Sequence, residues 1–282
     1  MIFPTERTRP GHNGLWLYAR IALLSVALVA VFVSGCAYHQ SVYPRLPEIT
    51  DPHRYLRDVL KAAPRLEQLS GFAYFNVTSP VQSFRSKNIF FFQRPENIRL
   101  EVLGFLNQTA LVFLTDGKTL QLAVPSQNSC YSGPALDKDI AAITGMWLRP
   151  NEIIDFFSGH PLAHITDSAK ISWSQDKKNY FFEITEAGST QYLWLRPDDA
   201  TIDKYTRFED GLLTLEIRYG PYSSIGGSRV PLTVELNGYA WQTRLSATFD
   251  SLQVSSIEEK LFLISPPRGA VCQPLEKFFK NQ

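Results

Sequence analysis

The chain of 282 residues lacks features that would point to several large classes of function. Its formal net charge is only +1, so no basic excess is present to drive nucleic-acid binding. It carries no G-x-S-x-G elbow, no H-E-x-x-H and no phosphate-cradling glycine loop. We therefore expect a protein that binds no nucleic acid, uses no cofactor and catalyses no reaction.

Histidine is scarce as well, with five residues in the chain. His160 and His164 are four apart, which is the spacing of two metal ligands on a helix. Pro161 lies between them and disfavours a helix there. A pair of loop residues without a metal is the expected arrangement.

Methionine and cysteine are also rare, whereas aromatic residues are abundant. The chain has two Met and three Cys, against 19 Phe, 12 Tyr and 5 Trp. Aromatic side chains are enriched in strands and suit a pleated, half-buried surface. The composition therefore favours a fold built mainly from β-strands.

The N-terminus has the plan of a secretory signal. Its apolar run, Ile21 to Val33, has 13 residues, whereas a helix needs about 20 to cross a bilayer. Val33-Ser34-Gly35-Cys36 closes this run and resembles the lipobox of bacterial lipoprotein precursors. That resemblance implies a leader over residues 1–35, cleavage before Cys36 and lipid on this cysteine. An ordinary signal peptide or an uncleaved anchor, with Cys36 incidental, is the alternative.

The residues after Cys36 predict how the protein is placed in the envelope. Residues 36–50 are extended and proline-containing, and they predict a tether between a membrane and the body of the protein. In the sorting rule of enterobacterial lipoproteins, Asp directly after the lipidated cysteine retains the protein at the inner membrane. Ala37 stands there in this chain. The resemblance thus implies the periplasmic face of the outer membrane.

Lipidation of Cys36 leaves Cys130 and Cys272 as an even pair in an oxidising compartment. We predict a disulfide between them, which would tie the C-terminal tail to the middle of the chain. Such a bond over a long loop stabilises a protein by about 2–4 kcal/mol. Two separate buried thiols are the alternative.

The body of the protein, residues 51–282, reads as one domain of strands with a few helices. Asp51 can cap a helix that begins with Pro52, and two further helices are predicted between Pro134 and Gly159. Elsewhere apolar and polar residues alternate, and Asp-Gly pairs predict hairpin turns. The Gly/Ser-rich stretch from Pro221 to Ser228 predicts a loop.

These elements predict a mainly β (α+β) fold. A sheet of about 11–12 strands is too large to stay flat and must curl. Amphipathic helices need an apolar surface to cover. We expect a single curled antiparallel sheet with helices covering its mouth.

One stretch resembles a known family. The sequence Arg94-Pro95-Glu96-Asn97-Ile98-Arg99-Leu100 is similar to the R-P-x-x-I/L-R-L stretch of LolB-like outer-membrane lipoproteins, of the LolA/LolB-like superfamily. Asp116-Gly117, Tyr131-Ser132-Gly133 and the two-helix segment follow in the family's order. The match covers about Leu66 to Gly159; beyond it only the order of strands agrees.

The resemblance implies a half-open β-barrel whose helices form a lid over an apolar cavity. It implies binding of acyl chains or lipoproteins, a periplasmic carrier as partner, and a part in lipoprotein or lipid localisation. The alternative is a non-enzymatic structural or interaction lipoprotein that uses a filled barrel as a scaffold. We expect a monomer whose membrane contact is made through lipidated Cys36.

Inward faces of strands supply the candidate cavity walls. The predicted lining residues are Phe90, Phe92, Leu100, Val112, Leu215, Ile217, Val234 and Trp241. The connection from Gly104 to Gln108 carries Phe105 and Leu106, two adjacent large apolar residues. In the LolB-like family the equivalent loop inserts an apolar residue into the membrane. The alternative is that both side chains fold back to cap the barrel.

Overall fold

The computed structural model describes residues 43–63, 66–80, 83–163, 165–263 and 272–280. The chain divides into two compact units, Met1–Pro44 and Arg45–Gln282. Cys36 and the predicted leader, residues 1–35, lie outside the described residues. The end of the predicted tether is bound to the body, because the Trp173 indole N–H donates to the carbonyl of Ile49 at 2.7 Å.

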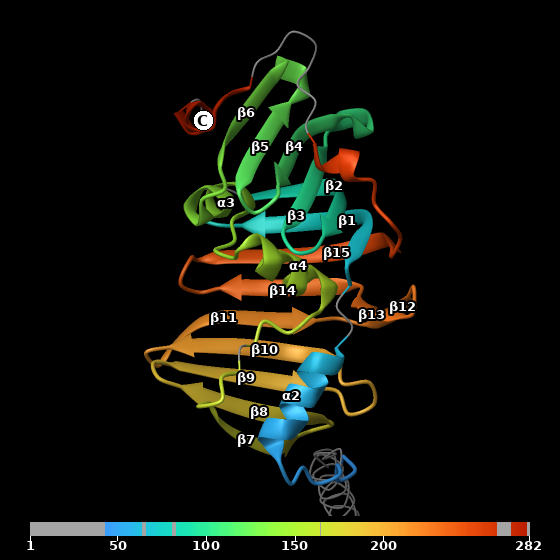
Figure 1. Cartoon of the computed structure of the whole chain (residues 1–282), viewed down its shortest axis with the longest axis vertical. Coiled ribbons are helices and arrows are strands. Elements are labelled where there is room, and N and C mark those ends of the chain that lie inside the picture. The colour runs from blue at the N-terminus through green and yellow to red at the C-terminus, as the bar shows by residue number, and fades with distance from the viewer. Residues whose placement is uncertain (1–42, 64–65, 81–82, 164, 264–271, 281–282) are drawn as a thin grey trace, which may run out of the picture. The chain divides into compact units, whose positions relative to one another are not determined.

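One large sheet forms the body of the second unit (Figure 1). Its first half consists of β1 (Gln68–Thr78), β2 (Ser83–Gln93), β3 (Asn97–Leu103), β4 (Thr109–Thr115), β5 (Thr119–Val124) and β6 (Ser129–Pro134). Its second half consists of β7 (Lys170–Asp176), β8 (Asn179–Glu186), β9 (Ser189–Leu195), β10 (Ile202–Glu209), β11 (Leu212–Tyr219), β14 (Thr233–Gly238) and β15 (Thr243–Gln253). A short strand near the C-terminus, β16 (Gln273–Pro274), completes it.

The order of the described strands shows an open sheet, with β16 at one edge and β7 at the other. In the part of the chain that the structure describes, 14 strands run in the order β16-β6-β5-β4-β3-β2-β1-β15-β14-β11-β10-β9-β8-β7. Neighbours are antiparallel, except that β16 pairs with β6 in parallel. The two meanders join where β1 pairs with β15. The prediction of one curled antiparallel sheet is confirmed, with more strands than the expected 11–12.

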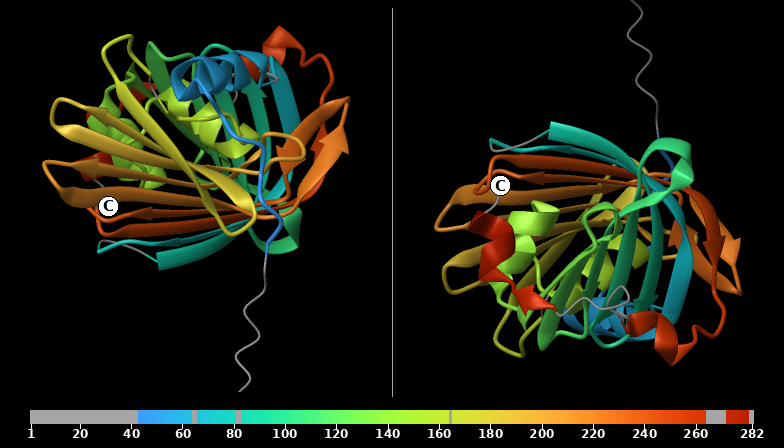
Figure 2. Two further views of the ribbon diagram at one scale, coloured as in Figure 1. Left: turned by 90° about the horizontal axis from the view of Figure 1, so that it is seen from below. Right: turned by 90° about the horizontal axis from the view of Figure 1, so that it is seen from above.

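Four helices accompany the sheet within the described ranges: α2 (Pro52–Ala62), α3 (Asp137–Thr144), α4 (Pro150–Ser158) and α5 (Glu276–Lys280). Figure 2 shows α2, α3 and α4 on the concave side of the sheet. As predicted, Asp51 caps α2, accepting from the Arg54 N–H at 2.9 Å. In the described ranges, no helix combines the length and the apolar character that a membrane span needs.

Helix α4 fills the middle of the concave face. Glu152 caps it by accepting from the Arg149 N–H at 2.9 Å, and the helix ends at Gly159, whose φ of 74° is left-handed. The ring of Phe157 is fully buried against Phe75, Phe92 and Phe249, at centroid distances of 5.3, 5.5 and 6.0 Å. One side chain of α4 thus reaches three adjacent strands, β2, β1 and β15.

The convex face carries a second, smaller apolar cluster. A short 3₁₀-helix, η3 (Glu259–Phe262), covers Leu114 and Phe91 there. The Arg99 guanidinium donates to the carbonyl of Leu261 at 2.7 Å and holds this segment in place. This cover explains why the sequence of β2 is apolar on both faces.

Candidate apolar ligand site

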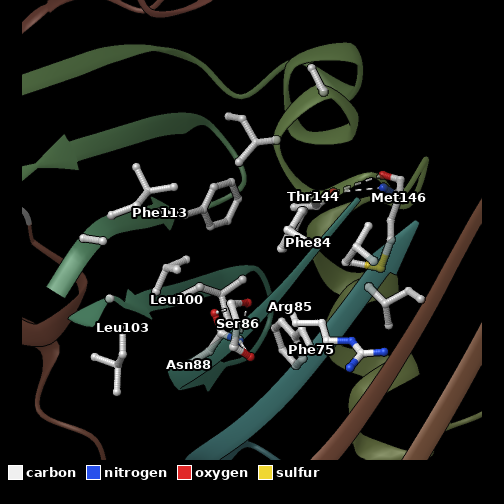
Figure 3. Close-up of a pocket in the computed structure, with 18 of the residues that line it drawn as sticks. Phe75, Phe84, Arg85, Ser86, Asn88, Leu100, Leu103, Phe113, Thr144 and Met146 are labelled. Atoms are coloured by element: carbon white, nitrogen blue, oxygen red, sulfur yellow. Dashed lines mark hydrogen bonds between the residues drawn. The ribbon is translucent and has the colours of Figure 1, made fainter. Parts of the chain in front are cut away.

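An apolar pocket lies between strands β1 to β4 and helix α3 (Figure 3). Its volume is about 380 Å³. Most lining residues are apolar: Phe75, Val77, Phe84, Leu100, Val102, Leu103, Gly104, Ala110, Leu111, Phe113, Ala142, Ile143, Met146, Leu245 and Phe278. The lining residues come from β1 to β4, from α3 on another side, and from β15 and α5. The site is therefore a concave apolar space of the size that small ligands occupy.

A few polar groups interrupt this apolar lining. Asn88 is 1% exposed, and its amide donates to the carbonyl of Ser86 at 3.1 Å and to the Ser86 hydroxyl at 3.0 Å. The Thr144 hydroxyl donates to the carbonyl of Ile140 at 2.8 Å and accepts from the Met146 N–H at 3.2 Å. These groups are bonded to the protein itself, so they do not require a polar ligand.

Charge is nearly absent from the pocket. Arg85 is the one charged residue among the described residues that line it, and it is exposed. A charged group buried in such a space would lose its hydration without an ionic partner. The pocket chemistry therefore favours an apolar ligand.

The structure places the eight predicted lining residues, all of them described, in four different environments. Leu100 lines the pocket. Fully or almost fully buried core positions are held by Phe90, Phe92, Leu215, Ile217 and Val234. These five are packed among other buried side chains of the core cluster. They therefore belong to the core instead of an open cavity wall.

Val112 and Trp241 do not line the pocket for local reasons. Phe113 points into the pocket, so Val112, its neighbour on the same strand, lies on the convex face together with Leu114. Trp241 lies in the turn between β14 and β15, where its half-buried ring covers Gly238. A Cβ atom at Gly238 would overlap that ring, so the glycine permits this packing.

The loop between β3 and β4 projects beside the pocket. Phe105 is 86% exposed and Leu106 is 72% exposed, so neither side chain folds back over the sheet. The Gly104 N–H donates to the carbonyl of Gln108 at 2.8 Å and closes the loop. Leu106 and Asn107 both have a φ of 58°, the left-handed region that non-glycine residues seldom adopt. Since Gly104 and Ala110 line the pocket, this exposed apolar loop stands at its edge.

A buried ion pair fixes α4 to the sheet. The Arg94 guanidinium pairs with the Asp155 carboxylate, and the two side chains are only 9% and 11% exposed. Arg94 also donates to the carbonyl of Leu66 at 3.0 Å. The His160 imidazole lies 3.7 Å from the same carboxylate. The predicted histidine partner, His164, lies outside the described residues, and no metal-binding cluster occurs among those that are described.

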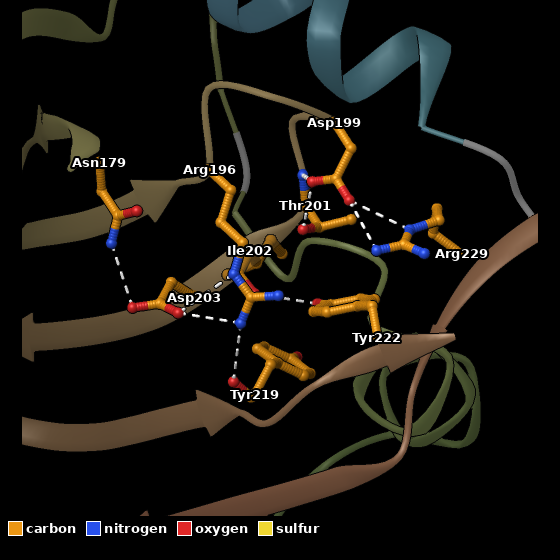
Figure 4. A network of polar contacts seen from close by, with 9 residues as sticks. All are labelled: Asn179, Arg196, Asp199, Thr201, Ile202, Asp203, Tyr219, Tyr222 and Arg229. Carbon is orange, nitrogen blue, oxygen red and sulfur yellow. Dashed lines mark hydrogen bonds and ion pairs between the residues drawn. The ribbon is translucent and has the colours of Figure 1, made fainter. Parts of the chain in front are cut away.

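A polar network beside strands β9, β10 and β11 holds an additional hairpin (Figure 4). The stretch from Pro221 to Ser228, predicted as a loop, contains strand β12 (Tyr222–Ile225), which pairs with β13 (Ser228–Pro231). The Arg229 guanidinium donates to the Asp199 carboxylate at 3.0 Å, and the Arg196 guanidinium lies 5.0 Å from the Tyr222 ring centroid. These contacts, which are remote in sequence, order a segment whose composition favours a loop.

Asp199 is the titratable centre of this network. Burial raises the pKa of Asp199, but hydrogen bonds from Thr201 and Arg229 outweigh that effect and hold the pKa below its ordinary value of 3.8. The carboxylate is therefore the favoured form. This pKa shift reflects the interaction of Asp199, in the β9–β10 turn, with Arg229 of the hairpin.

The structure pairs Cys130 with Cys272 in a disulfide. It joins β6 to the residues before β16 and α5, and it thereby brings Phe278 of α5 to the pocket. Sequence reasoning did not find Phe278 as a lining residue. The cysteine pair alone indicated that the C-terminal tail returns to the middle of the chain.

Comparison with known proteins gives the fold and little more. No family model and no curated protein matches the chain. A solved DUF1329 family protein from Desulfovibrio piger has a TM-score of 0.54 and 12% identity, covering 77% of this chain and 100% of that one. A lipoprotein-sorting protein domain from Vibrio parahaemolyticus has a TM-score of 0.51 and 10% identity, covering 74% and 95%.

A LolA superfamily protein from Nitrosomonas europaea has a TM-score of 0.47 and 12% identity, with coverage of 77% and 99%. At these levels of sequence identity the comparisons show similarity of fold alone. The predicted resemblance is confirmed at that level. The chain shares its fold with the DUF1329 family protein and with the lipoprotein-sorting protein domain, at low sequence identity.

Proposed function

We propose that this protein is a membrane-anchored lipoprotein whose pocket binds an acyl chain of a lipid or of a lipoprotein. The observation that carries the proposal is the position of the pocket: an apolar space of about 380 Å³ opens beside the exposed loop of Phe105 and Leu106. An acyl chain buries about 0.8 kcal/mol for each CH₂ removed from water. Such a ligand needs no charged partner, and the lining offers it almost none.

The exposed loop is the proposed point of contact with a membrane. Fully burying one large apolar side chain is worth about 1.5–3 kcal/mol, so two side chains suit a transient touch better than a permanent anchor. The loop is closed by its own hydrogen bond and stands clear of the core. A chain leaving the bilayer at this loop would meet the pocket next to it.

The proposed location is the periplasmic face of the outer membrane, with the lipid of Cys36 as anchor. The support is the lipobox, the residue Ala37 after it, and the lipoprotein-sorting description of one structural neighbour. A periplasmic carrier of lipoproteins is the partner that this location suggests. We also propose that the protein acts as a carrier or acceptor without catalysing a reaction.

The second candidate function is an interaction scaffold of the envelope. The observation in its favour is α4, whose buried side chains pack the middle of the concave face as an ordinary core. A scaffold requires such packing and makes no use of an open pocket. The two functions therefore differ in whether the pocket beside α3 binds a ligand.

Titration with a fluorescent fatty-acyl probe distinguishes the two functions. Ala142 lines the pocket from α3 and is exposed, so Ala142→Trp should block the space without disturbing the core. Leu136 is 46% exposed and does not line the pocket, so Leu136→Trp is the matched control. We expect saturable binding that Ala142→Trp weakens at least tenfold and Leu136→Trp leaves unchanged. Absence of binding to folded, delipidated protein would favour the scaffold.

The loop is tested by liposome flotation of residues 37–282, a form that lacks both the leader and the lipid anchor. Phe105→Ser together with Leu106→Glu should abolish association with liposomes and leave the melting temperature unchanged. Leu212→Glu is the matched control, because Leu212 is 72% exposed at the tip of another hairpin. A marked fall in melting temperature for the loop variant would instead place these residues in the core.

A further inference from the structure

Phe278 forms one wall of the pocket from an element that is remote in sequence from the rest. It belongs to α5, is half-buried, and packs edge-on against Tyr131 of β6 at a centroid distance of 5.3 Å. The other lining residues lie between positions 75 and 146, or at Leu245 of β15. The size of the pocket thus depends on where the C-terminal segment, Cys272–Lys280, is held.

Four kinds of contact hold the C-terminal segment on β6. Cys272 is bonded to Cys130, and β16 continues the sheet beside β6. The Leu275 N–H donates to the carbonyl of Ser132 at 3.0 Å, and the Leu275 side chain is 2% exposed. Gly133 permits this approach, since a Cβ there would lie 2.9 Å from that of Leu275. The last contact is the Phe278 ring itself.

We propose that the pocket takes a single acyl chain and that Phe278, held by the disulfide, limits the length of chain that fits. This inference rests on the proposed function. The volume of about 380 Å³ is near the lower end of the range of small-molecule pockets, about 300–1,000 Å³. It favours one chain over the several chains of a lipoprotein anchor. Without the ring of Phe278 the apolar space would extend toward Tyr131.

The proposal predicts a particular dependence of affinity on chain length. Each further methylene that enters the pocket should raise the affinity about fourfold, until the chain meets the wall. Beyond that length the affinity should stay constant, because additional methylenes remain in water. The length at which the plateau begins reports the position of Phe278.

The experiment measures dissociation constants of the full chain for a series of saturated fatty acids of increasing length, by displacement of a fluorescent acyl probe. Phe278→Ala should move the plateau to longer chains, and Phe278→Trp should move it to shorter ones. The double variant Cys130→Ser, Cys272→Ser should shift the plateau in the same direction as Phe278→Ala, because it removes the covalent one of the four contacts that hold the segment. Phe279→Ala is the matched control, since Phe279 is half-buried on the same helix but does not line the pocket.

A plateau at the same length in wild type, Phe278→Ala and Phe278→Trp would overturn the inference and leave the proposed function standing. A pocket that binds no fatty acid at all would overturn both. Circular dichroism and thermal melting verify that each variant is folded. If Phe278→Ala does not fold, the shift toward shorter chains in Phe278→Trp decides the matter.

Discussion

Truncation of Phe157 to alanine measures how tightly α4 fills the concave face. The ring is fully buried and contacts aromatic rings from three strands, so its removal leaves a cavity that the backbone cannot close. Such Phe→Ala substitutions cost about 3–5 kcal/mol of unfolding free energy. For a domain of this size that corresponds to a fall in melting temperature of roughly 6–20 °C.

Urea unfolding followed by tryptophan fluorescence gives the free energy, and calorimetry gives the melting temperature. Phe105→Ala serves as the control, because Phe105 is 86% exposed and a surface truncation changes stability by only about 0.5 kcal/mol. A loss below about 1 kcal/mol for Phe157→Ala would refute the reasoning that this helix packs as part of the core. Equal losses for the two variants would refute it as well.

Three further predictions concern charge and anchoring. Asp155→Ala should cost about 3–5 kcal/mol in urea unfolding because it leaves the Arg94 guanidinium buried and unpaired, and a loss below 1 kcal/mol would contradict this. Asp199→Asn should lower the melting temperature near neutral pH. Since the folded-state pKa of Asp199 is depressed, the difference in melting temperature from wild type should shrink as the pH falls below 3.8. A difference that does not depend on pH would argue against this role of the carboxylate. Cys36→Ser should release the protein from membranes or leave its precursor uncut, and membrane retention with the leader removed would count against lipidation.

Much of the fold follows from local sequence patterns. Asp51-Pro52 predicts the start of α2. Asp210-Gly211 forms the turn between β10 and β11, and both residues have positive φ angles, of 49° and 79°. Asn237-Gly238, a pair typical of turns, forms the end of β14 instead, and the turn to β15 follows at residues 239–242. Strand β12, within the predicted loop from Pro221 to Ser228, does not follow from local sequence, since Arg196 and Asp199, which hold the hairpin, are remote in sequence.

The candidate site is harder to predict from the sequence. The alternation of apolar and polar residues along a strand indicates which face a side chain lies on, but it does not indicate which residues that side chain contacts. Phe92 and Leu100 both face inward, yet Phe92 packs against Phe157 of α4, whereas Leu100 lines the pocket. That difference depends on where a helix packs on the sheet, and the local sequence pattern does not predict this position. Phe278 shows the same limit, because only the disulfide and the packing of Leu275 bring it to the pocket.

Photocrosslinking with a diazirine-bearing fatty acid tests the central claim most directly, because it locates the bound chain. The protein is irradiated with the probe, digested, and the labelled peptides are identified by mass spectrometry. We predict label on the pocket residues of β2 to β4 and α3, and its loss in Ala142→Trp. Label confined to the convex face near Leu114, or label that Ala142→Trp does not reduce, would contradict the account.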